Sequence, residues 1–329
     1  MLKKLIALAS LAAAFSSAGW IKPARVPQTS RDQTLVVGVF RPDGVIVPFA
    51  VYAKRKWTNP WHRPLPDAQP DEPNTIADLP TPWYESFVKP GVEWYVSLSA
   101  ADTNAVNTSR SVQVCSHCQQ VWGLLSDYPN AKLAERNECV RSLGIALSKK
   151  RAAQAMERLT DASPDWKQLL TFLGPEFELA ENAGPTEASQ HYYSQIPRTE
   201  ERAKVPLSML NLYRNQVPEE GQILFYFEVS KEYPKPPDSN DVGCNNISLL
   251  GGWALRDAHA KLALLDSQFN PTDCDWKEGG RVLPFMILQV DGKTFAIVEE
   301  DSYEGESYTI LEIQRDGVRH VLDTYAGSC

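Results

Sequence analysis

The hydrophobic and polar residues of this chain alternate most regularly near its C-terminal end. Apolar or alternating runs cover Arg281–Val290, 294–299, 307–315 and 318–325. Turn residues separate the runs: Asp291-Gly292, an acidic segment that contains Gly305, and Asp316-Gly317. Asp-Gly between alternating runs is a strong hairpin signal, because both central positions of a type I′ turn need a positive φ. The sequence therefore predicts a four-stranded antiparallel meander here.

The same unit, an apolar run followed by a glycine turn and an aromatic strand, recurs upstream. Each of three turn glycines is followed within a few residues by Phe and, eight residues after that Phe, by Tyr or Trp. The three copies are Gly292 with Phe295 and Tyr303, Gly221 with Phe225 and Tyr233, and Gly44 with Phe49 and Trp57. A weaker copy begins at Gly91. The spacing of 47 residues between Gly44 and Gly91 is typical of a four-stranded propeller blade. We expect a mainly β fold of β-propeller-like, repeated four-stranded meanders; the alternative is two β-sandwich-type sheets plus helices.

The middle of the chain predicts helices. Ser163 is a suitable N-cap, Pro164 fits the first helical position, and apolar residues follow at helical spacing until Gly174-Pro175 ends the run. Ala-rich residues 149–159 indicate a second helix, and residues 119–125 a short third one.

Four regions result from these patterns. Residues 1–18 combine Lys3 and Lys4 with an apolar run and small residues, which is typical of a bacterial-type signal peptide. Residues 19–118 are N-terminal β-rich modules with a Pro-rich loop at 60–82. Residues 119–204 are an α-helical insertion with a polar loop at 182–204, and residues 205–329 are C-terminal β-meander modules. We expect an exported, periplasmic or extracellular protein.

Charge and cysteine content narrow the classes of partner. The formal net charge of −8 argues against nucleic acid, whose phosphates need clustered Lys and Arg. Beyond the leader no apolar run approaches the length of a membrane span. Six cysteines in an exported chain predict disulfides. The candidates are Cys115, Cys118, Cys139, Cys244, Cys274 and Cys329.

Residues 288–298, read as LQVDGKTFAIV, and their sequel at 303–311 resemble the FG-GAP repeats of integrin-type β-propellers found in secreted bacterial proteins. The resemblance implies a propeller and an adhesive or binding role. It does not extend to calcium, because Asp291 alone remains of the several acidic or amide loop residues that calcium-binding repeats carry.

Cys115-Ser116-His117-Cys118 is the strongest candidate for a reactive motif in the sequence. A C-x-x-C motif between a β-type run and a helix is where thioredoxin-fold oxidoreductases place a reactive thiol. Structural disulfides, including one to Cys139, are the preferred interpretation, and zinc is a third, for which further regularly spaced ligands are absent.

Acidic and aromatic clusters give two further candidates. One acidic cluster contains Glu299, Glu300, Asp301, Glu304 and Glu306. It is a solvated acidic turn, a cation site or a catalytic carboxylate pair, and the same three interpretations apply to Asp273 and Asp275. An aromatic cluster in the N-terminal part contains Trp57, Trp61, Trp83 and Trp94, with His62 beside Trp61. These side chains either pack in the core or stack on a glycan.

These observations favour an exported, soluble, non-catalytic binding or structural module with an unknown protein or glycan ligand and without cofactor or metal. The alternative is an envelope enzyme, either a thiol-disulfide oxidoreductase that uses Cys115 and Cys118 or a hydrolase without a local signature. The sequence contains no H-E-x-x-H, G-x-S-x-G or P-loop motif that would favour an enzyme.

Overall fold

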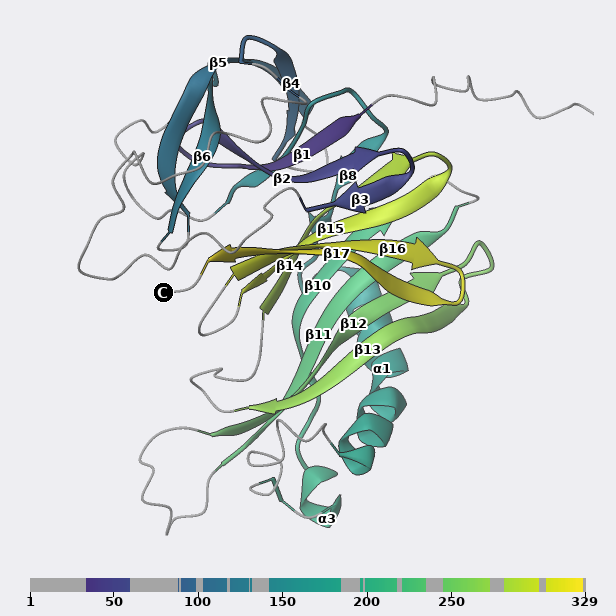
Figure 1. Ribbon diagram of the computed structural model, residues 1–329. Helices are drawn as coiled ribbons and strands as arrows, with labels where there is room; N and C mark the ends of the chain where they lie inside the picture. The colour runs from purple at the N-terminus through teal and green to yellow at the C-terminus, as the bar shows by residue number, and fades with distance from the viewer. Residues whose placement is uncertain are drawn as a thin grey trace, which may run out of the picture. The chain divides into compact units, whose positions relative to one another are not determined.

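The computed structural model describes residues 34–59, 88, 90–98, 103–116, 119–129, 131, 142–184, 196–197, 199–217, 221–234, 245–272, 281–301 and 306–327 (Figure 1). The predicted signal peptide at 1–18, the Pro-rich loop at 60–82 and residues 185–195 and 198 of the polar loop at 182–204 lie outside these residues.

Six antiparallel strands close into a barrel in the first half of the chain. They are β1 (Leu35–Phe40), β2 (Val45–Ala53), β4 (Glu93–Ser97), β5 (Thr103–Ser116), β6 (Gln119–Ser126) and β7 (Gly144–Leu147). The order around the barrel is β1, β2, β6, β5, β4, β7 and back to β1, and the short β3 (Lys56–Thr58) pairs with β2. Strands β4, β5 and β6 are consecutive neighbours and β7 returns to lie beside β4, which is a Greek key.

A buried ion pair occupies the turn between β1 and β2. Arg41 and Asp43 are 2% and 0% exposed, and their side chains lie 2.9 Å apart. Gly44 completes the turn with a φ of 79°, as the glycine pattern predicts. The Arg41 guanidinium also donates a hydrogen bond to the carbonyl of Cys115, and so links this turn to the end of β5.

Two open five-stranded antiparallel sheets follow the barrel. The first sheet contains β9 (Glu157–Arg158), β10 (Ser208–Gln216), β11 (Ile223–Tyr233), β12 (Asn246–Arg256) and β13 (Leu262–Thr272). The second sheet contains β8 (Ala153–Ala155), β14 (Arg281–Val290), β15 (Lys293–Asp301), β16 (Glu306–Gln314) and β17 (Gly317–Gly327). Each sheet is a four-stranded meander with one short strand added beside its first member.

The meander predicted at the C-terminal end is confirmed strand by strand. Asp291 and Gly292 have φ values of 52° and 75° between paired Val290 and Lys293, as the Asp-Gly turn predicts. The second turn lies one residue earlier than predicted, because Gly317 pairs with Gln314 and is part of the ladder.

One extended segment connects the two sheets. Its first part, β8, pairs with β14 of the second sheet, and two residues later β9 pairs with β10 of the first sheet. Met156 lies between them, and its backbone N–H donates to the carbonyl of Phe285 at 2.9 Å. The prediction of a helix at 149–159 is therefore wrong. The helix propensity of its alanines is small, and pairing with two sheet edges outweighs it.

Four hydrophobic clusters fill the space between these elements. One takes side chains from all six barrel strands and includes Trp94, which is fully buried. A second joins the outer surface of the barrel to the second sheet, through residues such as Phe49 and Phe295. A third packs the second sheet on the first, with Met156 and Trp253 among its members. The fourth packs the other face of the first sheet on the helix α1 (Pro164–Ala183).

Helix α1 begins as predicted but ends later. The hydroxyl of Ser163 accepts from the backbone N–H of Asp165, and Pro164 follows the cap. The predicted end at Gly174-Pro175 is wrong, because the helix continues to Ala183. Leu169, Leu173 and Phe177 form one fully buried stripe that continues past the proline, and burial of such side chains stabilises by roughly 1.5–3 kcal/mol each, which offsets the cost of about 3 kcal/mol for an interior proline.

The predicted architecture is correct in its main class and wrong in two features. The chain is mainly β, but the described strands form a closed barrel and two stacked sheets and no propeller. The insertion at 119–204 is only partly helical. It contains α1 and the short α3 (Thr199–Arg202), but residues 119–126 form β6, where a helix was predicted. None of the helices in the described part combines the length and apolar character needed to cross a membrane.

A polar cluster holds the end of the second sheet. The Glu312 carboxylate on β16 is 2.9 Å from the Lys293 ammonium on β15 and also accepts a hydrogen bond from Arg319 on β17. Burial alone raises the pKa of Glu312, but the hydrogen bonds from Arg319 and Lys293 outweigh it and lower that pKa to about 2.

We expect Glu312 to make the stability of the protein depend on pH. A carboxyl group whose pKa is lower in the folded state stabilises the fold fully above its ordinary value of 4.5, and this contribution disappears as pH falls toward about 2. The melting temperature of Glu312→Gln should therefore lie below that of the wild type at pH 7, and the difference should shrink between pH 5 and pH 2. Glu178→Gln on the exposed side of α1 is the control for loss of one charge. Parallel curves for wild type and Glu312→Gln across this range would contradict the assignment.

Candidate functional site

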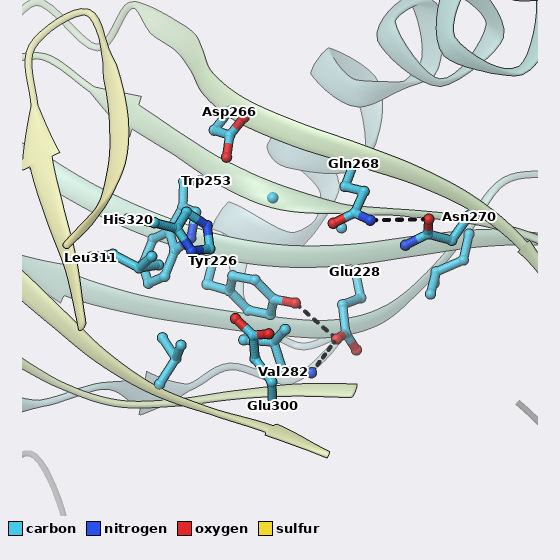
Figure 2. Close-up of a pocket in the computed structure, with 14 residues that line it drawn as sticks. Tyr226, Glu228, Trp253, Asp266, Gln268, Asn270, Val282, Glu300, Leu311 and His320 are labelled. Carbon is cyan, nitrogen blue, oxygen red and sulfur yellow. Dashed lines mark hydrogen bonds between the residues drawn. The ribbon is translucent and has the colours of Figure 1, made fainter. Parts of the chain in front are cut away.

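A cavity of about 270 Å³ lies between the two C-terminal sheets (Figure 2). Strands β11, β12 and β13 of the first sheet supply one wall, and β14, β15, β16 and β17 of the second sheet supply the other. Since both walls are paired β-strands, the polar side chains that face the cavity are held on ordered backbone.

Two adjacent glycines on β12 shape this space. A Cβ atom on Gly251 would lie 3.4 Å from the Tyr226 hydroxyl and 3.7 Å from Cγ of Glu228, so this position points toward the cavity floor. A Cβ on Gly252 would lie 2.2 Å from the carbonyl oxygen of Asp266, which is a clash. Gly251 therefore leaves the space open, and Gly252 allows β13 to approach β12 closely. From the sequence alone, two adjacent glycines in such a run indicate only a tight strand or a bulge.

Glu228 is a buried carboxylate in the middle of β11. It is 3% exposed, and the hydrogen bonds that it accepts from the described residues all come from neutral groups. The Tyr226 hydroxyl donates at 2.9 Å and the Val282 backbone N–H at 3.2 Å to one oxygen, and the Asn211 amide donates at 2.5 Å to the other. Burial, followed by the charge of Glu228, raises the pKa of Tyr226 well above its ordinary value, so this hydroxyl remains a proton donor.

Glu300 faces the cavity from the second sheet and is half-buried. Burial raises the pKa of Glu300; the charge of His320 and a hydrogen bond from Thr309 lower it, and the charge of Asp323 raises it. Among the described residues that line the cavity, His320 is the one basic side chain, and it is 56% exposed.

The rest of the wall is mixed in character. Asp266, Gln268 and Asn270 project from alternate positions of β13, so they share one face of the sheet. The Gln268 amide donates to Asn270 at 3.2 Å. Tyr226 and Trp253 form an aromatic pair with ring centroids 5.2 Å apart. The cavity thus combines carboxylates, amides and aromatic rings, which is the mixture that orients a small ligand.

The predicted acidic cluster is divided by the structure. Glu299 and Glu300 are consecutive on β15 and face opposite sides, as neighbours on a strand must. Glu299 is 4% exposed and pairs with Tyr308 on the side that packs on the barrel, whereas Glu300 lines the cavity. The two carboxylates therefore do not converge on one ligand. The side chains of Asp301 and Glu306, and the residues Glu304, Asp273 and Asp275, lie outside the described part.

The predicted tryptophan cluster is also divided. Trp57 and Trp94 are 9% and 0% exposed and belong to hydrophobic clusters, so both are core residues. Trp61, Trp83 and His62 lie outside the described residues. Trp253, which does line the cavity, follows the two glycines in the sequence and was not among the predicted contacts.

Cys115 lies near the end of β5 and is 7% exposed. Strand β6 follows it, where the oxidoreductase interpretation requires a helix. Cys115 is disulfide-bonded, and all other cysteines lie outside the described residues. The described residues contain no group of three or more His, Cys, Asp or Glu side chains able to hold a metal ion.

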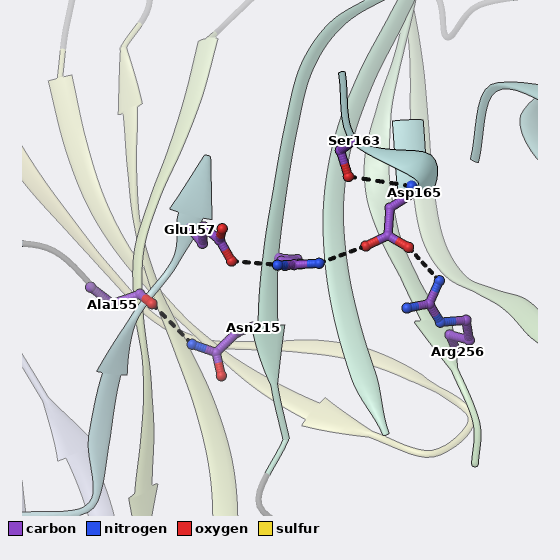
Figure 3. Close-up of polar contacts among 7 residues, drawn as sticks. Ala155, Glu157, Ser163, Asp165, Asn215 and Arg256 are labelled. Carbon is purple, nitrogen blue, oxygen red and sulfur yellow. Dashed lines mark hydrogen bonds and ion pairs between the residues drawn. The ribbon is translucent and has the colours of Figure 1, made fainter. Parts of the chain in front are cut away.

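A second polar cluster joins helix α1 to the first sheet (Figure 3). The Asp165 carboxylate is 2.9 Å from Arg214 on β10 and 2.5 Å from Arg256 on β12, and Arg214 also pairs with Glu157 at 2.8 Å. Nearby, the Asn215 amide donates to the carbonyls of Gln154 and Ala155 at 3.1 Å each. Every charge in this cluster has a partner of opposite sign, so its role is to fasten the helix and the connecting segment to the sheet.

Comparison with known proteins adds no constraint on this site. No family model, no curated protein and no solved structure matches the chain. The cavity between the two sheets must therefore be interpreted from its own chemistry.

Proposed function

We propose that this chain is an exported, non-catalytic binding protein that holds a small ligand in the cavity between its two C-terminal sheets. The observation that carries the proposal is the opening at Gly251, where any larger side chain would occupy the floor beside Tyr226 and Glu228. Export rests on the pattern of residues 1–18. At about 30 Å³ per water molecule, the cavity has room for roughly nine non-hydrogen atoms.

The geometry gives less support to a hydrolase. Both oxygens of Glu228 accept hydrogen bonds from fixed donors on neighbouring strands, so this carboxylate is held by the fold. A pair of catalytic carboxylates needs one free group to act as base or nucleophile beside the acid. Glu300, whose pKa is raised by burial, could serve as the acid of such a pair. Glu228 is not free to act as its base or nucleophile, because both of its oxygens are held by hydrogen bonds.

A cavity-filling substitution tests the binding function. Gly251→Leu should abolish binding of small molecules to the cavity, and Gly251→Ala should weaken it, because each places atoms in the floor without a backbone clash. Gly174→Leu on α1 is the matched control, since a Cβ there meets no atom within 4 Å. Isopentylamine, isopentanol and isovalerate serve as probes of three charge types, and thermal denaturation reads out binding. A bound probe at ten times its Kd stabilises by about 1.4 kcal/mol.

The binding proposal fails if none of the three probes raises the melting temperature of the wild type. It also fails if Gly251→Leu, folded by circular dichroism, responds to a probe as strongly as wild type and Gly174→Leu do.

The reactivity of Cys115 separates the binding proposal from the oxidoreductase alternative. A catalytic thiol needs access to solvent and a cation or helix N-terminus to lower its pKa. Cys115 is nearly buried, and the charge of the neighbouring Arg41 is paired with Asp43. After mild dithiol treatment at pH 6 and alkylation, peptide mapping should therefore show no selective label on Cys115. Labelling of Cys115 alone would favour the redox function.

A further inference from the structure

Buried carboxylates in this fold are generally paired with a cation. Among the residues that the structure describes, four have one within ion-pair distance: Asp43 with Arg41, Asp165 with Arg214 and Arg256, Glu181 with Lys231, and Glu312 with Lys293 and Arg319. This is the expected arrangement, since a buried charge without a partner is costly.

The cavity departs from this arrangement. Three carboxylates line it, on Glu228, Asp266 and Glu300, and among the described residues no Lys or Arg lies in its wall. Glu228 accepts hydrogen bonds from neutral donors, and within the described part of the chain His320, which is exposed, is the basic side chain that acts on Glu300. The wall therefore carries an excess of negative charge, from the buried Glu228, the half-buried Glu300 and the exposed Asp266.

We infer that the cavity binds a small organic cation, with a primary ammonium group between Glu300 and the ring of Tyr226 and a short hydrocarbon part against Leu249, Val298 and Leu311. The inference rests on the proposed binding function and names the chemical class of its ligand. Leu249 belongs to the first sheet and Val298 and Leu311 to the second, so the apolar part would be held from both sides.

The aromatic wall supports a cation in particular. Glu300 and Tyr226 lie next to each other in the cavity (Figure 2), and the negative charge of Glu300 acts on the Tyr226 hydroxyl. Trp253 packs on the other side of Tyr226. Aromatic faces attract ammonium groups, and the attraction increases where water is excluded. A carboxylate ligand would instead meet three negative side chains, and a neutral ligand would leave the charge of Glu300 uncompensated.

The titration of Glu300 agrees with this placement. Burial raises its pKa, which means that the partly desolvated position of Glu300 disfavours the charged carboxylate. The other charged groups around it are Asp323 and His320 on β17, with Glu228 on β11 and Asp266 on β13 as further carboxylates of the wall. An ammonium ligand would compensate the carboxylate and favour its charged form.

Isothermal titration calorimetry at pH 7.5 with three probes of one shape tests the ligand class. Isopentylamine, isopentanol and isovalerate share a hydrocarbon part and differ in the charge of the head group. The amine should bind wild type at least about tenfold more tightly than the alcohol, as expected for a hydrogen bond to a charged group. Isovalerate should show no binding.

Two variants locate the charge that matters. Glu300→Gln should weaken binding of the amine by about tenfold or more and leave binding of the alcohol unchanged. Glu178→Gln removes the same charge from the exposed side of α1 and should leave both affinities at the wild-type value. Equal losses in Glu300→Gln and Glu178→Gln would assign the preference to the net charge of −8 and overturn the inference.

The outcomes separate this inference from the proposed function. If the alcohol or isovalerate binds as tightly as the amine, and Gly251→Leu abolishes that binding, the cation inference is wrong and the binding function stands. If no probe binds, or if Gly251→Leu binds the amine like wild type, both are wrong.

Discussion

The position of the two C-terminal sheets depends on one short segment that belongs to both. Residues 153–158 supply the edge strand β8 to the second sheet and, after Met156, the edge strand β9 to the first. A free edge would pair with other chains, and this segment covers the edges at β14 and β10 at once. The Asn215 amide fixes the point where the segment passes from one sheet to the other, because it donates to the consecutive carbonyls of Gln154 and Ala155. The Met156 side chain lies in the core between the sheets. The separation of the sheets is thus fixed at this side, and the cavity lies between strands β11 to β13 of the first sheet and β14 to β17 of the second.

Local patterns in the sequence predict those parts of the fold that depend on neighbours along the chain. The C-terminal meander, the positive φ of Gly44 and Gly292 and the cap at Ser163 all follow from residues only a few positions apart. Features that depend on distant pairing do not. Closure of the barrel requires β7 to pair with both β1 and β4, and the aromatic hairpin pattern that suggested propeller blades is equally compatible with barrels and open sheets. The segment at 149–159 has the composition of a helix and becomes a strand because two sheet edges are available to it.

The cavity was harder to predict, because its residues come from seven strands. Two signals were present in the sequence. Glu228 directly follows the apolar run 223–227 within the strand Ile223–Tyr233, and Gly251-Gly252 interrupts the strand Asn246–Arg256. A charged residue and a missing side chain within buried strands both indicate a site that packing alone does not explain. Their meeting across the register of β11 and β12, where Glu228 pairs with Gly251, needed the structure. Glu300 was noticed for its acidic neighbours, but strand alternation separates it from Glu299 and joins it to residues far away in sequence.

The cavity differs from the other polar clusters described above in whether its carboxylates have cationic partners. At Asp165, two arginines from different strands converge on one carboxylate and bind the helix to the sheet. At Glu312, two cations lower the pKa of the carboxylate and so favour its charged form. Glu300 shows the opposite behaviour, because burial raises its pKa and its neighbours do not reverse the shift. Under the proposed cation binding, an ammonium group beside Glu300 would compensate a carboxylate whose charged form burial disfavours. The same charge imbalance would then give the cavity its selectivity for positive charge.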